Sequence, residues 1–576
     1  MKIIVAKTGG FCMGVRRAVD MVLQASTRNS PPIYTYGPLI HNPQVLSILN
    51  EKGISVMTEI PEKGEGTVLI RAHGVPPEAQ QRLQDAGFRV LNATCPHVIK
   101  VQTIIRTHTR KGYASIIIGD KDHPEVVGLM GYANGKGRVA ADIEGLSAIP
   151  LFEKGIVVAQ TTQNSRLFQE IQAWARDNAP HYKIFNTICN ATDKRQAEVR
   201  QIADSVDAVV VVGGHNSGNT TRLAQIVRES GKPVYHVETE EELPADAFAS
   251  VQTVGITAGA STPQWIIKKV YRSCEGMLLK NEKSWRVMFF NLQRTLLWTS
   301  IYLALGAGSI CYTGLKLQGF DYLSPPVLVS MLYIISMHTF NHLTGRKADR
   351  FNDPDRAAFY RSNRGILTAL AVAAGAAGLA IASYVGPLAF LILLLMSVLG
   401  ISYNLRLVPK QLHTGRYRRI RDIPGSKTVL IALGWGLVTS IVPSIMRSGA
   451  VPGGTLLVFL WSASLVFVRT AFFDILDIHG DRITGRETFP IVLGEASTMR
   501  LLKGILVLNM GVLFFSSLLG WISPLGFVLM LVSVLLYLSI AAYEQSRMSP
   551  GIGLEFLIES HLVLTGVLGW LSTLGS

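Results

Sequence analysis

Long apolar segments dominate the second half of this chain, and they restrict its fold more than any other feature. Hydrophobic residues make up 48% of the 576 residues. Beyond Trp285 they gather into stretches close to the roughly 20 residues that a helix needs to cross a bilayer. Up to about Lys280, short Val- and Ile-rich runs alternate with polar helical stretches and turns, a pattern typical of soluble α/β domains. We therefore predict a soluble domain at residues 1–281 and an all-α membrane domain at residues 286–576.

The membrane domain is predicted to contain about nine transmembrane helices. They lie near residues 292–312, 322–340, 366–384, 388–403, 428–445, 455–473, 501–519, 522–543 and 554–574. Alternate loops, at about 346–364, 406–427 and 482–503, carry most of the Arg and Lys residues, so the positive-inside rule puts these loops and the first domain in the cytoplasm. We expect a multi-pass protein of the cytoplasmic (inner) membrane, with the lipid bilayer as a partner. These loops account for much of the net charge of +15. The sequence has no basic stripe with interleaved aromatic residues, so we do not expect nucleic-acid binding.

Three isolated cysteines, Cys12, Cys95 and Cys189, occur in turn contexts of the first domain at similar intervals. One such cysteine is usually a small buried apolar residue. Three of them, each supplied by its own α/β unit, suit a cubane iron–sulfur cluster that leaves one iron open for substrate. Five cysteines without paired spacing in a cytoplasmic setting argue against disulfides. Cys274 and Cys311 are expected to be unligated packing residues.

Three histidines also stand beside turn signals: His41 before Asn-Pro, His73 before Gly, and His123 before Pro. Any one of them could be an ordinary structural histidine. As a set with the Gly-rich loops at 214–220 and 259–263, they indicate an anionic pocket, because imidazoles and backbone amides at helix starts both bind phosphate. The first domain is therefore expected to hold a diphosphate beside a metal cluster.

Many short motifs of residues 1–280 together resemble the LytB family of 4-hydroxy-3-methylbut-2-enyl diphosphate reductases. The motifs are Phe11-Cys12-x-Gly14-Val15, Ile40-His41-Asn42, Arg71-Ala72-His73-Gly74, Ala93-Thr94-Cys95-Pro96, His123-Pro124-Glu125, Gln160-Thr161-Thr162, Thr187-Ile188-Cys189 and Thr257-Ala258-Gly259-Ala260-Ser261. The resemblance implies a trefoil of three pseudo-threefold-related α/β units around an iron–sulfur cluster. It also implies reductive dehydration of the allylic alcohol to isopentenyl and dimethylallyl diphosphates, with electrons from a ferredoxin- or flavodoxin-type donor.

The resemblance also implies a role for each matched residue. Cys12, Cys95 and Cys189 would hold a [4Fe-4S] cluster. The diphosphate would bind to the histidines and to the loops after two late strands, at His41, His73, His123, Ser217, Gly218, Asn219 and Ser261. Glu125 is the expected proton donor, because a carboxylic acid in a dry pocket has a raised pKa, and Thr161 would orient both Glu125 and the substrate hydroxyl.

Three positions depart from the LytB pattern. Asn92 and Asn186 stand where the family usually has Asp, which changes the charge near the cluster. Gly218 replaces the second Ser of the usual Asn-Ser-Ser-Asn motif. We expect Gly218 to weaken substrate binding without abolishing the chemistry.

The membrane half contains three acids, Asp474, Asp477 and Asp481, just beyond an apolar run. Their i, i+3, i+7 spacing puts them on one helical face. A solvated helix end is the ordinary explanation for such acids. They would repel one another unless a divalent cation lay between them, so a Mg²⁺ site completed by substrate phosphates is the functional alternative.

This acidic segment resembles the second aspartate-rich motif of the UbiA superfamily of intramembrane prenyltransferases. The motifs Tyr403-Asn404 and Asp422-Ile423-Pro424-x-x-Lys427 also match. The first motif departs from the family's Asn-Asp-x-x-Asp-x-x-x-Asp, because it reads Asn341-His342-x-x-Gly345-x-x-x-Asp349. The resemblance implies ionisation of an allylic prenyl diphosphate, with Lys427 or Arg346 neutralising the leaving diphosphate and Asp349 as a further magnesium ligand.

The sequence therefore predicts a reductase fused to a prenyltransferase that acts on a lipophilic acceptor. Two alternatives remain open. The membrane half could be a degenerate anchor or lipid-binding module, or the whole chain could be a redox sensor without turnover.

Overall fold

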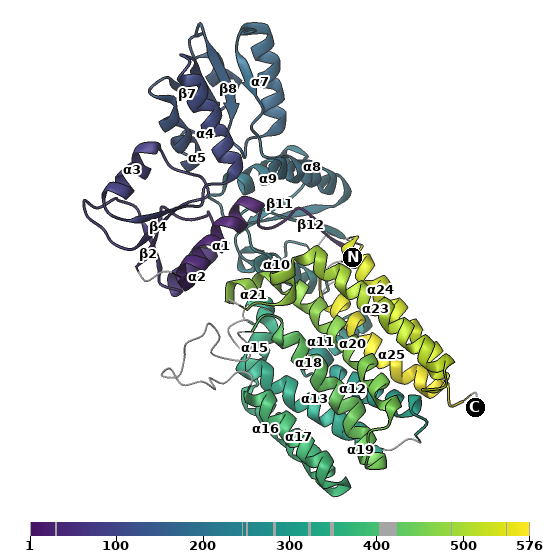
Figure 1. The fold of residues 1–576 in the computed structure, drawn as a ribbon. Helices are drawn as coiled ribbons and strands as arrows, with labels where there is room; N and C mark the ends of the chain where they lie inside the picture. Colours follow the sequence, from purple (N-terminus) through teal and green to yellow (C-terminus); the bar gives the residue numbers. More distant parts are fainter. Residues whose placement is uncertain are drawn as a thin grey trace. The chain divides into compact units, whose positions relative to one another are not determined.

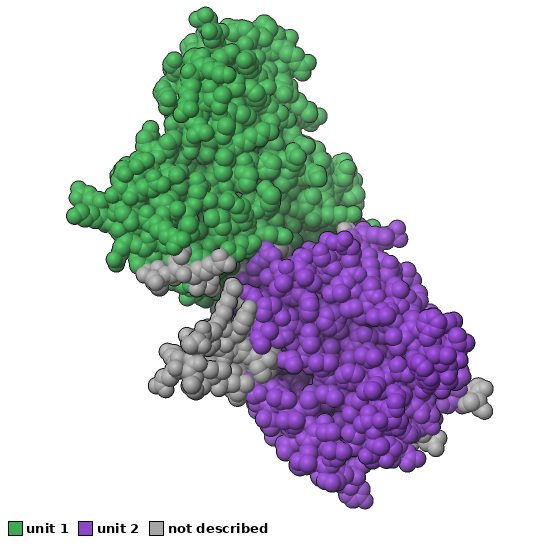
Figure 2. Space-filling view, in the orientation of Figure 1, with its two compact units in different colours: residues 1–281 green, residues 282–576 purple. Residues whose placement is uncertain are grey.

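The computed structural model describes residues 2–28, 32–244, 246–248, 251–279, 284–320, 324–345, 349, 351–402, 423–484, 486–545, 547–548 and 550–574. The chain divides into two compact units, Met1–Asn281 and Glu282–Ser576 (Figure 2). The first unit is α/β and the second is helical. Arg346 and the motif residues Tyr403, Asn404 and Asp422 lie outside the described residues.

The first unit contains three four-stranded parallel sheets. Their strands are β1 (Lys2–Val5), β2 (Ile33–Tyr36), β3 (Ile54–Met57), β4 (Thr67–Ile70), β5 (Arg89–Asn92), β6 (Ala114–Ile118), β7 (Gly137–Ala140), β8 (Gly155–Ala159), β9 (Lys183–Phe185), β10 (Ala208–Val212), β11 (Val234–Val237) and β12 (Thr253–Ala258). The strand orders are β3-β2-β4-β5, β7-β6-β8-β9 and β11-β10-β12-β1. Figure 1 shows β2 with β4, β7 with β8, and β11 with β12 in three separate lobes.

The three sheets share one topology, with the N-terminal strand β1 completing the third sheet. Each has two central strands and two edge strands in equivalent chain order. The central strands β6, β8 and β10 are buried along their whole length, as expected for parallel strands covered on both faces, and this explains their near-continuous Val/Ile composition. These three equivalent parallel units are consistent with the trefoil expected from the sequence.

Helices connect these strands and cover the sheets. They are α1 (Met13–Arg28), α2 (Pro43–Glu51), α3 (Pro77–Asp85), α4 (Pro96–Thr109), α5 (Pro124–Met130), α6 (Ile143–Ser147), α7 (Ser165–Asn178), α8 (Asn190–Ser205), α9 (Gly218–Glu229) and α10 (Gln264–Leu279), with short 3-10 turns η1 (Gly131–Ala133) and η2 (Glu240–Glu242). Separate apolar clusters lie beneath them in each lobe. Cys274 and Cys311 are fully buried.

The second unit consists of helices α11 (Ser284–Trp298), α12 (Ile301–Leu317), α13 (Ser324–Thr344), α15 (Pro354–Ser362), α16 (Arg364–Val385), α17 (Pro387–Ser402), α18 (Ser426–Gly436), the π-helix η5 (Leu437–Ile441), α19 (Val442–Ser448), α20 (Gly453–Leu476), α21 (Ile478–Thr484), α22 (Phe489–Leu493), α23 (Glu495–Leu518), α24 (Leu525–Glu544) and α25 (Ile552–Leu571). Six helical segments in the described residues are long and apolar enough to cross a membrane, or seven if α11 and α12 count as one span. The unit therefore has the character of a membrane-embedded region, and the count of nine stays a prediction.

Two predicted helices are interrupted in the structure. The predicted first span, 292–312, is interrupted: α11 ends at Trp298, Ser300 has a φ of 60°, and α12 starts at an angle of 69° to α11. The acidic segment is also not one helix. Because α20 ends at Leu476 and α21 begins at Ile478, Asp474, Asp477 and Asp481 do not share one continuous helical face.

Candidate functional site

The predicted site residues of the first unit follow the carboxyl ends of the central strands. His41 follows β2, His73 follows β4, and His123 follows β6. The loops that contain Thr161, Ser217 and Ser261 occupy the equivalent places after β8, β10 and β12. Parallel sheets bind ligands beyond the carboxyl ends of their strands, and the repeated topology supplies six such loops. That is why residues far apart in sequence meet here.

The three imidazoles form one cluster. Their ring centroids lie 4.8 Å (His41–His73), 5.4 Å (His73–His123) and 5.8 Å (His41–His123) apart. One ligand atom from each ring lies within 4.8 Å of the other two, and within the described residues this is the only group of three or more His, Cys, Asp or Glu with its ligand atoms so close. The three rings therefore converge on one small region.

Burial keeps the three histidines neutral near pH 7. It lowers the pKa of His41, and the nearby Arg71 lowers it further. Burial lowers the pKa of His73 well below its usual value, assisted by the other two histidines, and lowers that of His123 to about 4. The backbone N–H of Glu125 donates to His123 Nδ1 at 3.1 Å, so the proton of neutral His123 resides on Nε2, where it can be donated to an anion.

Several buried polar atoms around this cluster have no protein partner. They are His41 Nε2, His73 Nδ1, and both side-chain amide atoms of Asn219. Buried polar groups are nearly always hydrogen-bonded in proteins, so these atoms fit a polar ligand. Ser261 Oγ lies 3.4 Å from Ser217 Oγ and donates to the His41 carbonyl at 3.1 Å, which joins the hydroxyls of the third lobe to the loop of His41.

Gly218 belongs to this group as well. A Cβ at this position would lie 3.5 Å from His123 Nε2 and 3.6 Å from Thr162 Oγ1, which is ordinary van der Waals contact. Serine therefore fits without strain and adds a hydroxyl beside the histidines. If the substrate is the diphosphate that the sequence predicts, Gly218→Ser should lower its KM several-fold, since one added hydrogen bond to a charged group contributes about 1.5 kcal/mol or more. Steady-state kinetics with Gly218→Ala as the control tests this, and an unchanged KM would contradict it.

Glu125 and Thr161 form a closely bonded pair. The Thr161 backbone N–H donates to Glu125 Oε1 at 2.7 Å, and the Thr161 hydroxyl donates to Oε2 at 2.8 Å. Glu125 is only 2% exposed. Burial raises its pKa to about 7, against the opposing effect of the two Thr161 hydrogen bonds. A carboxyl group with this pKa can carry a transferable proton at neutral pH.

The three sequence-predicted cysteines all lie at the start of a helix. Cys12 directly precedes α1, Cys95 precedes α4, and Cys189 precedes α8. Helix N-termini favour negative charge, so thiolates and an anionic cluster are stabilised there. Val15 N–H donates to Cys12 Sγ at 3.5 Å. Burial raises the pKa of the Cys95 thiol, and Cys12 and Cys189 raise it further, so both of these cysteines lie within electrostatic range of Cys95.

These thiols fit a cluster better than a single ion. Each thiolate of a cubane binds a different iron, so the sulfurs stay further apart than ligands of one ion, and the three thiols do not form a single-ion site in the described residues. A Cβ on Gly14 would lie 2.6 Å from Cys95 Sγ. This close approach explains why glycine occupies the first turn of α1.

Two arginines beside the cysteines, Arg17 and Arg195, were not assigned roles from the sequence. Arg195 is buried and interacts electrostatically with Cys12 and Cys189. Arg17 Nη1 donates to the Thr94 carbonyl at 2.9 Å, which ties α1 to the loop of Cys95. Both arginines place positive charge beside the predicted cluster.

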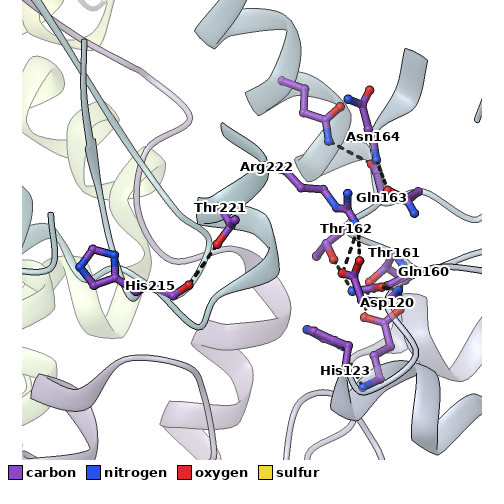
Figure 3. A network of polar contacts seen from close by, with 12 residues as sticks. Asp120, His123, Gln160, Thr161, Thr162, Gln163, Asn164, His215, Thr221 and Arg222 are labelled. Atoms are coloured by element: carbon purple, nitrogen blue, oxygen red, sulfur yellow. Dashed lines mark hydrogen bonds and ion pairs between the residues drawn. The ribbon is translucent and has the colours of Figure 1, made fainter. Parts of the chain in front are cut away.

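An ion pair near His123 connects the second and third lobes. Arg222 of α9 donates to both carboxylate oxygens of Asp120 at 3.0 Å. The Asp120 backbone N–H in turn donates to Gln160 Oε1 at 3.0 Å, and Gln160 Nε2 donates to Thr162 Oγ1 at 2.9 Å (Figure 3). This network fixes the loop that carries Thr161 against the His123 loop.

The second unit encloses a cavity of about 500 Å³. Apolar side chains, among them Tyr333, Met337, Leu430 and Trp435, form much of its wall. Charged residues line the remainder: Asp349, Arg356, Lys427, Arg469, Asp477, Arg486, Glu487, Glu555 and Glu559. An amphipathic molecule with a charged head and an apolar tail matches this division.

The four predicted magnesium ligands are not brought together. Asp349 and Asp477 line the cavity, whereas Asp474 and Asp481 are fully buried behind its wall. Asp474 accepts hydrogen bonds from Lys427 and Thr428, and Asp349 lies 3.0 Å from His342 Nδ1. Around this cavity, no group of three described ligands has its atoms close enough for one ion. Asp349 and Asp477 remain the two predicted ligands that line the cavity, and a Mg²⁺ site of one or two carboxylates completed by substrate phosphates stays a prediction.

Comparison with known proteins assigns both units. Residues 3–275 match the family described as LytB protein, and residues 296–551 match the UbiA prenyltransferase family. The chain is similar to a 4-hydroxy-3-methylbut-2-enyl diphosphate reductase of Aquifex aeolicus (strain VF5), with 42% identity over 295 residues that cover 48% of this chain and 99% of the relative.

Two solved structures are similar to one half each. A structure of (E)-4-hydroxy-3-methyl-but-2-enyl diphosphate reductase has 42% identity and a TM-score of 0.38, and the match covers 48% of this chain and 100% of that one. An apo structure of a UbiA homolog from Aeropyrum pernix K1 has 14% identity and a TM-score of 0.37, covering 46% and 96%. The chain therefore belongs, through residues 3–275, to the LytB family of 4-hydroxy-3-methylbut-2-enyl diphosphate reductases, and it carries a UbiA prenyltransferase family domain at residues 296–551.

Proposed function

We propose that the first unit reduces (E)-4-hydroxy-3-methylbut-2-enyl diphosphate to isopentenyl and dimethylallyl diphosphates. Cys12, Cys95 and Cys189 would hold a [4Fe-4S] cluster, which supplies the electrons and a Lewis-acidic iron when bound. The observation that carries the proposal is that one unit contains three thiols, two of them within electrostatic range of Cys95, together with a histidine cluster and a buried acid whose pKa is raised to about 7. Electrons would come from a ferredoxin- or flavodoxin-type donor.

The histidine cluster would bind the diphosphate. Neutral imidazoles, the Ser217 and Ser261 hydroxyls and the Asn219 amide offer hydrogen-bond donors, and several of their buried atoms have no protein partner. Charge-assisted hydrogen bonds to phosphate oxygens are stronger than neutral ones. The substrate therefore supplies the negative charge that the pocket is built to accept.

Glu125 and Thr161 would deliver the proton that converts the substrate hydroxyl into water. When Glu125 is protonated, its Oε2–H can donate to Thr161 Oγ1, which reverses the direction of the 2.8 Å bond. The Thr161 hydroxyl is then free to donate to the substrate oxygen. The Thr161 backbone N–H keeps Glu125 in place through the 2.7 Å bond to Oε1.

Replacing His73 with Ala should raise KM by roughly tenfold or more, because a hydrogen bond to a charged ligand contributes about 1.5–3 kcal/mol. Turnover at saturation should change less, since His73 contacts the diphosphate rather than the reacting carbon. His108→Ala is a matched control, because His108 bonds to its own helix at Ile104. A KM within twofold of the parent value would contradict this role.

A complementation experiment tests the reductase proposal in cells. The full chain, expressed in a bacterium depleted of its own reductase, should restore growth. A Cys189→Ser chain, expressed to the same level, should not. Growth restored equally by both chains, or by neither, would contradict the proposal.

For the second unit, we propose transfer of a prenyl group from a prenyl diphosphate to a lipophilic acceptor in the cytoplasmic membrane, with the first unit on the cytoplasmic side. The cavity with an apolar wall and a charged end supports this. Membranes containing the chain should convert labelled prenyl diphosphate into a new lipid. An inactive anchor is the competing function, favoured by the loss of two first-motif acids at His342 and Gly345, and it predicts no labelled lipid.

A further inference from the structure

The first helix of the second unit, α11, carries a stripe of exposed apolar side chains. Trp285, Met288, Phe289 and Leu292 follow one another at positions i, i+3, i+4 and i+7, so they lie on one face of the helix. Their side chains are between 51% and 69% exposed. None of residues 284–298, all of which the structure describes, is fully buried. The helix therefore lies on the surface of its unit with this apolar stripe uncovered.

A sharp bend separates α11 from α12. Ser300, which lies between the two helices, has a φ of 60° and is only 3% exposed. Residues other than glycine seldom adopt this conformation, so the packing around Ser300 holds the bend. α12 packs against α25, which is long and apolar enough to cross a membrane, and α11 is inclined at 69° to α12. The bend therefore directs α11 away from the membrane normal and toward the membrane plane.

The last residue of α11 contacts a helix of the first basic loop. The rings of Trp298 and Phe359 lie 5.5 Å apart, and Phe359 belongs to α15, within the basic loop 346–364. The positive-inside rule predicts that this loop is cytoplasmic. We therefore expect α11 to lie at the cytoplasmic surface of the membrane, where the headgroups include anionic phospholipids.

The charge of α11 is complementary to such a surface. The helix contains Arg286 and Arg294 and no acidic residue. The Arg286 guanidinium lies 5.5 Å from the centre of the Trp285 ring, and the Arg294 guanidinium lies 5.1 Å from the centre of the Trp298 ring. Tryptophan is enriched at the level of the lipid headgroups, and arginine binds phosphate oxygens with its planar fork of donors. These pairs therefore suit the membrane interface.

The exposed surface of a spanning helix in the same unit has a different composition. Phe515 and Leu518 of α23 are 61% and 62% exposed, and the run 504–518 around them contains no charged residue. That surface suits acyl chains alone. α11 instead combines large apolar side chains with arginines, which is the composition of amphipathic helices that lie in the interface.

We propose that α11 is an interfacial helix that lies in the cytoplasmic surface of the membrane and binds anionic phospholipids. The apolar stripe enters the boundary between headgroups and acyl chains, and the two arginines bind lipid phosphates. The first span then consists of α12, whose 17 residues are at the lower end of the length that crosses a bilayer. The inference rests on the membrane character of the second unit and not on either catalytic activity.

The test places a photo-cross-linking residue on the apolar stripe of the full chain. p-Benzoylphenylalanine replaces Trp285 in one protein and Leu292 in another, and each is reconstituted into phosphatidylcholine vesicles with a minor share of phosphatidylglycerol. After irradiation, mass spectrometry identifies the attached molecule and the lipid carbon that carries the bond. Both positions should give lipid adducts at similar depth. In a spanning helix, two residues seven positions apart would differ in depth by about 10 Å.

The same adducts report the class of lipid. Phosphatidylglycerol should be over-represented several-fold relative to its share of the vesicle, since one basic residue near an anionic surface strengthens association about fivefold. Combining Arg286→Gln with Arg294→Gln should remove this enrichment. Combining Arg447→Gln with Arg500→Gln, at two exposed arginines elsewhere in the unit, is the matched control and should preserve it. The cross-linker at Phe515 should give lipid adducts without enrichment.

The remaining outcomes each overturn a stated part of the proposal. Adducts to the first unit or to a second chain, in place of lipid, show that protein covers the apolar stripe and overturn membrane binding. Lipid adducts that differ in depth by about 10 Å overturn the in-plane orientation. Lipid adducts without enrichment, or with enrichment that the double arginine variant retains, overturn the role of the arginines. Both cross-linker positions are more than half exposed, so neither replacement should disturb the fold.

Discussion

Replacing Cys95 with Ser should reduce reductase turnover to background and sharply lower the iron and sulfide content of the purified chain. Cys95 lies at the start of α4, within electrostatic range of Cys12 and Cys189, and two thiolates alone do not hold a cubane in place. A serine hydroxyl has nearly the same size, so the fold should persist. Iron and sulfide analysis after anaerobic purification, together with far-UV circular dichroism, measures both effects.

Cys274→Ser is the matched control for this experiment. Cys274 is fully buried in α10, and burial raises its pKa to about 12; the sequence predicts that it is an unligated packing residue. The control protein should therefore retain its iron and its turnover. A Cys95→Ser protein that kept full turnover, or a Cys274→Ser protein that was folded but lost its iron, would contradict the cluster assignment.

Replacing Glu125 with Gln should lower turnover roughly 10²- to 10⁴-fold, the usual contribution of a positioned general acid. In the parent chain the Thr161 N–H donates to Glu125 Oε1 at 2.7 Å. Glutamine has the same shape and its amide oxygen can accept this bond, but it has no transferable proton. KM should change little, because in the proposed function the carboxyl group acts on the substrate hydroxyl while the histidines bind the diphosphate. Steady-state kinetics under strictly anaerobic conditions measures the split between turnover and KM.

The pH dependence provides an independent test of the same residue. The donor is active when protonated, and burial raises the pKa of Glu125 to about 7, so kcat/KM should fall as pH rises above about 7 and should be flat below it. The histidines have pKa values below their usual range, so their titration should not contribute above pH 7. A pH profile that the Glu125→Gln protein shares with the parent would contradict the assignment.

The fold of the first unit was largely predictable from local signals. Val- and Ile-rich runs such as 208–212 and 155–159 predict buried parallel strands, and both are fully buried. The circular completion of the third sheet by β1 was not predictable in this way. It depends on pairing between Lys2–Val5 and Thr253–Ala258, which lie at opposite ends of the unit and carry no local signal of contact.

The contacts around the histidine cluster were also not predictable from the sequence. The sequence motifs identify His41, His73 and His123, but only the folded structure shows that their rings lie 4.8 to 5.8 Å apart. The Asp120–Arg222 ion pair joins residues that are 102 positions apart. Its two members are ordinary charged residues in sequence, so pattern alone could not select them.

The membrane unit departs most from its sequence-based description. Helical periodicity places Asp474, Asp477 and Asp481 on one face, whereas the helix ends at Leu476 and restarts at Ile478. The spacing argument fails because it assumes a continuous helix. Asp474 accepts hydrogen bonds from Lys427 and Thr428, which lie 47 and 46 positions earlier in the chain. These two partners could not be inferred from the acidic motif itself.

Turnover by the anaerobically purified full chain tests the central claim most directly. Protein purified in detergent should contain about four iron and four sulfide per chain. With a chemical reductant, it should convert (E)-4-hydroxy-3-methylbut-2-enyl diphosphate into isopentenyl and dimethylallyl diphosphates. Iron-loaded protein that consumes no substrate would contradict the reductase proposal, and turnover by iron-free protein would contradict the role of the three cysteines.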